Sequence, residues 1–156
     1  MAVADTVARP ARSDSTFVSS MAAAMTATVL LGFARSFYLK PVFHAPPDLS
    51  LLMVVHVVAF TAWMAVLVIQ TGFVATNRRD LHMKLGAFGA ALAALMVVLG
   101  TWLAIDALQR GFSPVAGVPA KMFFAIPFFD MLVFAGIATA GILNRGRTAW
   151  HKRFMI

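Results

Sequence analysis

The sequence contains no cysteine and no glutamate, and charged residues of all kinds make up only 12% of its 156 residues. The absence of cysteine excludes disulfides, iron–sulfur clusters and thiolate metal sites within this chain. The absence of glutamate excludes di-metal and proton-relay motifs built on that residue. Any acidic side chain must therefore be one of the six aspartates.

Hydrophobic residues make up 61% of the chain, against roughly 45–50% in soluble domains. A small soluble domain buries only about two-thirds of the surface of its unfolded chain, so much of this apolar surface must meet lipid. The formal net charge is +7, but the basic residues lie in short clusters at the ends of apolar runs. That pattern is typical of membrane topology signals. We therefore expect the lipid bilayer as a partner and no nucleic acid.

Four apolar runs are long enough to cross a hydrocarbon core, which needs roughly 20 helical residues. They cover residues 17–39, 51–75, 85–107 and 122–143. We predict an all-α integral membrane helical bundle over residues 17–144, built from two tandem helical hairpins. Residues 1–16 are expected to form a flexible tail and residues 145–156 a basic one. The first run could instead be a cleaved signal peptide, but it continues through Leu39 without a clean small-residue cleavage site.

The distribution of lysine and arginine predicts the orientation. Nine of the thirteen lie in the two tails and in the turn around Arg78 and Arg79, whereas the two opposite loops hold three. Positive charge favours the cytoplasmic side. We expect a bacterial inner-membrane protein with both termini in the cytoplasm.

Two similar segments occur at the cytoplasmic ends of spans. Residues 79–85 and 148–154 each place a histidine, His82 or His151, before basic and apolar residues. This echo suggests tandem hairpins in parallel orientation, although any cytoplasmic helix end attracts basic and amphipathic residues. A span follows His82 within three residues, whereas the chain ends shortly after His151. We therefore expect the sequence to be truncated before further helices.

Each predicted span brings one ionisable side chain into the outer half of the bilayer: Arg35, His56, Asp106 and Asp130. A charge inside the hydrocarbon costs about 2.5–3.5 kcal/mol on insertion scales and is usually paired. We expect Arg35 to form an ion pair with Asp106 or Asp130, near His56. The cluster would form a polar pocket with His56 as ligand or proton carrier, or a structural ion pair that fixes helix packing.

Pro127 lies within the fourth predicted span, three residues before Asp130. A proline inside a helix kinks it and frees a carbonyl one turn back, near Phe123. A kink beside an acid is one way to form a small polar site within a membrane. Gln70 and Trp63 are interpreted as packing and membrane-interface residues.

The histidines allow a second hypothesis. A b-type haem needs two axial histidines at matching depth, and the candidates are His56, or His82 with His151. The same inner pair, with Asp80 nearby, could bind zinc or copper, or act only as an interfacial anchor. No nucleophile–base pair, phosphate loop or zinc-protease motif is present, so no catalytic residue and no metal site is assigned.

Three segments resemble a family of uncharacterised bacterial multi-pass inner-membrane proteins. The family pattern reads G-F-x-R, a hydroxyl residue, an aromatic residue and Y-L, then L-H-R-R-L-G, then H-K-R-L-M. The matching segments here are residues 32–39, 81–86 and 151–155, with Phe154 in place of the last leucine. The resemblance implies further helices but no particular activity. A His-x-x-x-Gly pattern is distantly similar to membrane cytochromes b.

We therefore predict a non-enzymatic membrane component that handles a small solute or ion, or serves as an accessory subunit. It would associate with other membrane subunits or with copies of itself. The alternative is a haem-b-dependent membrane redox protein that uses His56 or the His82–His151 pair.

Overall fold

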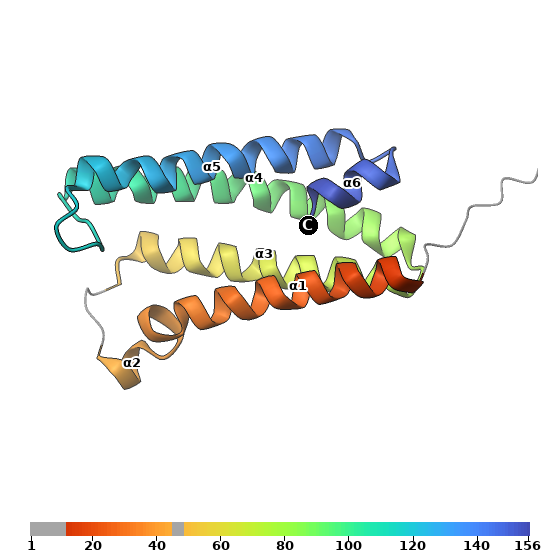
Figure 1. The fold of residues 1–156 in the computed structure, drawn as a ribbon, viewed down its shortest axis with the longest axis horizontal. Helices are drawn as coiled ribbons and strands as arrows, with labels where there is room; N and C mark the ends of the chain where they lie inside the picture. Colours follow the sequence, from red (N-terminus) through yellow and green to blue (C-terminus); the bar gives the residue numbers. More distant parts are fainter. Residues whose placement is uncertain (1–11, 45–48) are drawn as a thin grey trace, which may run out of the picture.

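The computed structural model describes residues 12–44 and 49–156, and every regular element in this part of the chain is helical. Figure 1 shows that the long helices run side by side. They are α1 (Arg12–Phe33), α3 (Leu51–Ala75), α4 (Arg79–Gln109) and α5 (Ala120–Leu143). A π-helix, η1 (Ala34–Tyr38), continues α1, and the short helices α2 (Lys40–Phe43) and α6 (Thr148–Phe154) complete the set. The predicted all-α bundle is confirmed.

All four long helices are long and apolar enough to cross a membrane, by length and composition. The predicted second span coincides with α3, which begins after Ser50. The Ser50 hydroxyl accepts a hydrogen bond from the Met53 N–H at 3.2 Å and so satisfies one of the free donors of the first turn. The turn into α4 is short because Asn77 adopts the left-handed conformation (φ 60°), which asparagine tolerates better than most residues.

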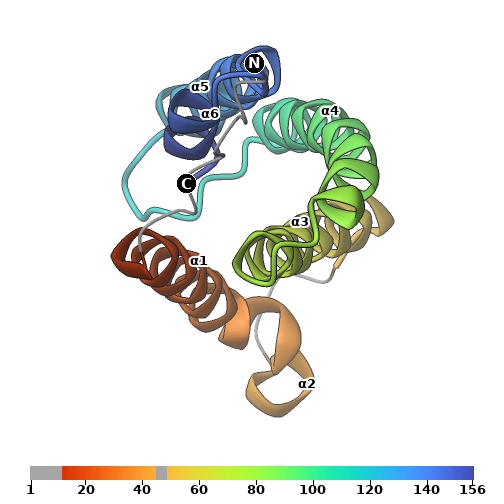
Figure 2. The ribbon, with the colours of Figure 1, turned by 90° about the vertical axis from the view of Figure 1, so that its right-hand side faces the viewer.

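The long helices form a curved row. Helix α1 packs against α3, α3 against α4, and α4 against α5. Figure 2, an end-on view, shows that the row bends into an arc with the C-terminus on its concave side. One end of the bundle, called here the basic end, carries the Arg78–Arg79 turn and α6; the other, the α2 end, carries α2 and the loop between α4 and α5.

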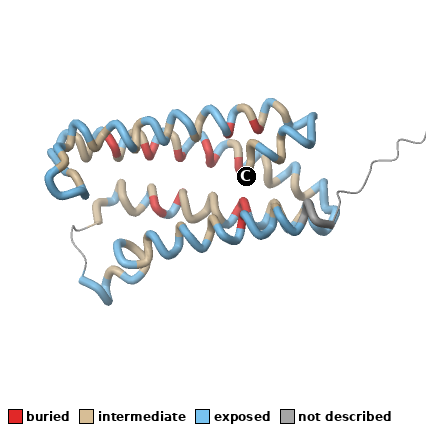
Figure 3. Tube along the Cα trace, in the orientation of Figure 1, coloured by how far each residue is buried: buried red, intermediate tan, exposed pale blue. Residues whose placement is uncertain are grey.

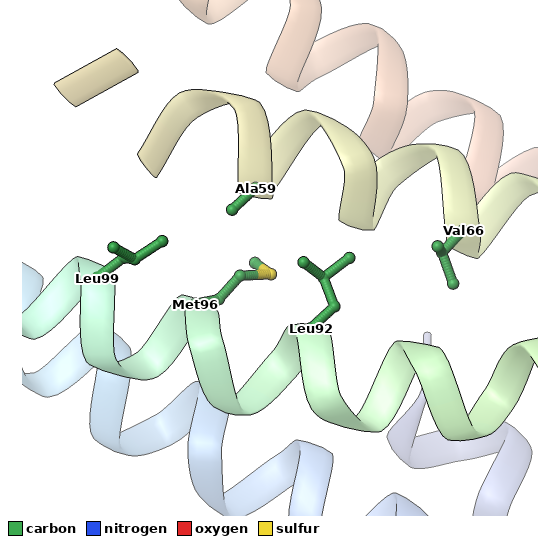
Figure 4. Packing of buried hydrophobic residues seen from close by; sticks show 5 residues of the cluster. All are labelled: Ala59, Val66, Leu92, Met96 and Leu99. Carbon is green, nitrogen blue, oxygen red and sulfur yellow. The ribbon is translucent and has the colours of Figure 1, made fainter. Parts of the chain in front are cut away.

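The best-buried part of the molecule is the seam between α3 and α4. Its members are small and medium-sized apolar side chains that interdigitate across the two helices, as Figure 4 shows: Ala59, Val66, Leu92, Met96 and Leu99. Most other positions are half-buried or exposed, as Figure 3 shows. Large apolar side chains cover the outer surfaces, as expected for a protein whose solvent is lipid.

Two predicted boundaries differ from the structure. Helix α4 begins at Arg79 and not at residue 85, because Arg, Leu, Met and Lys all favour helix and the chain stays helical through the polar turn. The predicted basic tail over 145–156 contains α6, which packs against α5. Of the predicted flexible tail, residues 1–11 lie outside the described residues, and α1 already begins at Arg12.

Candidate functional site

His56 lies on the face of α3 that looks across the arc. Trp63 is seven residues further along the same face, and its ring meets that of Phe134 on α5 edge-on, with centroids 5.4 Å apart. His56 itself is half-buried, and its ring lies tilted by 31° against that of Phe60, with centroids 4.3 Å apart. Its Nδ1 atom is buried and has no hydrogen-bond partner. A buried ring nitrogen without a partner is unusual in a folded protein and calls for a ligand or a proton.

Asp130 lies on the face of α5 that looks back toward α3. It precedes Phe134 by four residues, which places the two side chains one above the other on the same helix face. The Asp130 side chain is exposed. The contact between Trp63 and Phe134 joins α3 to α5 across the arc. His56 precedes Trp63 by seven residues on α3, and Asp130 precedes Phe134 by four on α5.

Helix contacts show how deep each residue lies. In the α3–α4 seam, Gly89 faces Val66: a Cβ added to the glycine would lie 3.4 Å from Cγ1 of the valine. The two helices run antiparallel, so ten residues back along α3 corresponds to ten residues forward along α4. This places His56 level with Leu99.

The α4–α5 contact completes the comparison. Gly100 packs directly against the Met131 side chain, so Asp130 lies level with Thr101. Leu99, which marks the level of His56, and Thr101 are two residues apart on α4. The depths of His56 and Asp130 therefore differ by about 3 Å along the helix axis. His56 and Asp130 thus face the same concave side at nearly the same depth.

Pro127 leaves a backbone acceptor without its helical partner. It sits inside α5, three residues before Asp130. Proline has no N–H, so the carbonyl of Phe123 receives no helical hydrogen bond from position 127. Phe123 precedes Asp130 by seven residues, about 10 Å along the helix axis, so this carbonyl lies away from the level that His56 and Asp130 share.

Arg35 and Asp106, the other two residues of the predicted polar cluster, have other surroundings. Asp106 forms an ion pair with Arg110, one turn later on α4, so the expected pairing with Arg35 is wrong for this residue. An arginine at i+4 on the same helix reaches the carboxylate without bridging two helices. Arg35 lies on η1 and is exposed; within residues 12–44 and 49–156 neither it nor Asp130 takes part in an ion pair.

The Arg35 region is instead attached to α3 through its neighbour Tyr38. The Thr61 hydroxyl donates to the carbonyl of Val57 at 2.7 Å, so the Tyr38 hydroxyl is the donor in its 2.6 Å hydrogen bond to Thr61. This bond joins η1 to α3 five residues beyond His56, about 7.5 Å further along the helix axis. π-Helical turns are rare and are frequent at functional sites.

A second polar group lies at the basic end. The rings of His82, in the first turn of α4, and His151, in α6, have centroids 6.1 Å apart and planes at 85°. Nδ1 of His151 lies 2.7 Å from the carbonyl oxygen of Gly141, while Nδ1 of His82 is buried without a partner. The two segments that echo each other in sequence therefore meet in space.

Gln70 was interpreted as a packing residue, but it belongs to this second group. Its amide nitrogen donates to the carbonyl oxygen of His82 at 3.2 Å, and its own carbonyl oxygen is buried without a partner. The Gln70 amide also lies beside Gly86: a Cβ at this glycine would be in ordinary van der Waals contact with the amide nitrogen, at 3.5 Å. A polar residue inside an apolar run is the sequence signal for such a role.

Comparisons with known proteins found no match. No protein-family model, no curated protein and no solved structure is similar to the chain. The chemistry must therefore be argued from the two polar groups alone.

The described residues hold no cluster of three or more His, Asp, Glu or Cys side chains that could enclose a metal ion. Among them, His82 and His151 are the histidines whose rings face each other; His44 is exposed at the end of α2, and His56 contacts Phe60. The haem hypothesis, at His56 or at the His82–His151 pair, stays a prediction.

Proposed function

We propose that this chain is a non-enzymatic component of the bacterial inner membrane that binds a small cation, including the proton, at His56 and Asp130. With both termini and the Arg78–Arg79 turn in the cytoplasm, His56 and Asp130 lie in the outer half of the bilayer. The observation that carries the proposal is the placement of the buried, unbonded Nδ1 of His56 and the exposed Asp130 at one depth on one side of the arc.

The chemistry of the two polar groups favours a positive ligand. A carboxylate and a neutral imidazole nitrogen are both acceptors, and both suit a proton or a small cation. An ionised Asp130 without a partner would cost about 2.5–3.5 kcal/mol within the hydrocarbon on insertion scales. Binding a cation or a proton offsets this cost without a covalent step, which is why we propose ion handling and not catalysis.

Carbodiimide labelling tests the proposal. Dicyclohexylcarbodiimide reacts with protonated carboxyl groups in apolar surroundings, and mass spectrometry identifies the modified residue. In lipid nanodiscs we expect labelling at Asp130 that slows as pH rises or as one of Na⁺, K⁺ or Ca²⁺ is added. Asp106 is the matched control: it lies on a neighbouring span but is ion-paired with Arg110, and it should remain unlabelled.

Two histidine variants sharpen the test. His56→Ala should abolish protection of Asp130 by the cation or shift its pH dependence, whereas His44→Ala, at an exposed site, should change neither. If no cation and no pH change alters the labelling of Asp130, or if both variants behave like the parent protein, the proposed function is wrong.

The exposed Arg35 favours a second candidate, an accessory subunit. A guanidinium group near the end of a membrane helix can extend to the interface or pair with a carboxylate of another chain. For the subunit hypothesis, native mass spectrometry from nanodiscs should show a homo-oligomer that Arg35→Gln dissociates. A monomer of unchanged mass in both proteins would contradict it.

A further inference from the structure

We propose that His82 and His151, assisted by Met155, form a binding site for a soft monovalent metal ion, Cu(I), at the basic end of the bundle. This site is separate from the cation site proposed at His56 and Asp130 and does not depend on it. The proposal begins with the 6.1 Å distance between the two imidazole centroids.

That distance is close to the one expected for two rings that share a metal ion. A metal lies about 2 Å from each ligating nitrogen, and the nitrogen lies about 1 Å from the ring centre. A linear arrangement therefore separates the centroids by about 6 Å, and a tetrahedral one by about 5 Å. The observed separation fits the linear geometry that two-coordinate Cu(I) adopts, and planes at 85° are compatible with rings turned about a common axis.

The hydrogen bonding of His151 prepares it to be a ligand. A carbonyl oxygen can only accept, so Nδ1 of His151 must carry the hydrogen in its 2.7 Å contact with Gly141. In the neutral ring this leaves the lone pair on Nε2. Metal-binding histidines characteristically donate their other N–H to a carbonyl or carboxylate, which fixes the tautomer and the orientation of the ring. His82 contributes a buried Nδ1 that has no hydrogen-bond partner.

Met155 brings a soft sulfur to the same place. It follows His151 by four residues, directly after the end of α6, and its sulfur packs on Gly141, 2.6 Å from where a Cβ would be built. The carbonyl of that glycine is also the partner of His151. Thioether and imidazole ligands without carboxylate or thiolate select Cu(I) among biological metals.

The surrounding charge favours a monovalent ion over a divalent one. Six exposed arginine and lysine side chains lie in the segments that carry the pair, namely the start of α4, α6 and the turns before them: Arg78, Arg79, Lys84, Arg145, Arg147 and Arg153. Asp80 in the first turn of α4 supplies one negative charge there. The ligands themselves are neutral, so a divalent ion would still bring two positive charges into a net positive field. A single charge is repelled half as strongly.

Competition with a chromophoric chelator tests the site. Purified protein in nanodiscs, under anaerobic conditions with ascorbate, is titrated with the Cu(I) complex of bicinchoninate. We expect one Cu(I) per chain, a more than tenfold loss of affinity in His82→Ala and in His151→Ala, and a smaller loss in Met155→Leu. His44→Ala, at an exposed site outside both polar groups, is the matched histidine control and should bind as the parent does.

A second measurement distinguishes loss of the metal site from misfolding of a variant. The thermal midpoint of each variant is compared with and without Ag(I), a redox-inert ion of the same charge, so that every protein serves as its own reference. The parent should be stabilised and the His82 and His151 variants should not. No binding, equal losses in the control variants, or tighter binding of Zn²⁺ than of Cu(I) would overturn the proposal. A Soret band that disappears in His82→Ala would also overturn it, because the pair would then hold haem.

Discussion

The packing of α3 against α4 positions His56, and Met96 is the residue through which this packing can be measured. Met96 is 1% exposed and lies at the centre of the seam with Ala59, Leu92 and Leu99. Met96→Ala removes about 70 Å³ of side chain; at about 24 cal/mol per Å³ of residual cavity, the loss of stability is about 1.7 kcal/mol.

This value of about 1.7 kcal/mol does not include a free energy for transferring apolar surface out of water. Helices that separate within a membrane or a micelle remain in apolar surroundings, so lost van der Waals contact is the main term. The assay is equilibrium unfolding in mixed micelles by titration with dodecyl sulfate, followed by far-UV circular dichroism.

Met122→Ala provides the matched control. Met122 is 69% exposed near the start of α5, so the same chemical change there should alter the free energy of unfolding by less than about 0.5 kcal/mol. If the two variants lose similar stability, or if Met96→Ala costs less than about 0.5 kcal/mol, then close packing at the seam does not hold α3 and α4 together.

Two further predictions concern polar contacts. Tyr38→Phe should lower the free energy of unfolding by about 0.6 kcal/mol and by no more than about 1.7 kcal/mol, the range of interhelical hydrogen bonds in membranes. A double-mutant cycle with Thr61→Val should show a coupling energy of that size. Additive losses of stability in the double mutant would mean that the hydrogen bond contributes nothing. Asp106→Asn should cost less than about 0.5 kcal/mol, because its ion pair with Arg110 is a partly exposed i,i+4 pair. A larger loss in the same unfolding assay would show that Asp106 has a second role inside the bundle.

The sequence predicted the long helices well because their signal is local. The run over 51–75 is apolar from end to end and coincides with α3. Hydropathy marks where lipid begins, however, and not where a helix begins, so α4 extends six residues beyond its predicted start at residue 85. The π-helical turn η1 has no sequence signature and could not have been predicted.

The candidate sites were predictable as residues but not as arrangements. His56 and Asp130 stand out because ionisable groups are rare in apolar runs. Their common depth follows only from contacts such as Val66 with Gly89, which depend on the tertiary structure.

The sequence also contained signals for the Asp106–Arg110 ion pair and, in part, for the His82–His151 pair. The pairing of Asp106 with Arg110 could have been found from the four-residue spacing on one helix. The similarity between the segments around His82 and His151 indicated two equivalent positions. It could not show that α6 turns back along α5 and brings the rings together.

The curved row also has a consequence for the order in which the helices acquire their neighbours. In the most apolar part of α1 and η1 only 6% of the residues are buried, against 39% in α4. Helix α1 is synthesised first, yet its packing partner α3 emerges later, and α4, on which α3 rests, later still. Of the four spans, the one synthesised first therefore has the least buried packing. Its amides should be the first of the four spans to exchange their hydrogens with solvent through local opening of the structure.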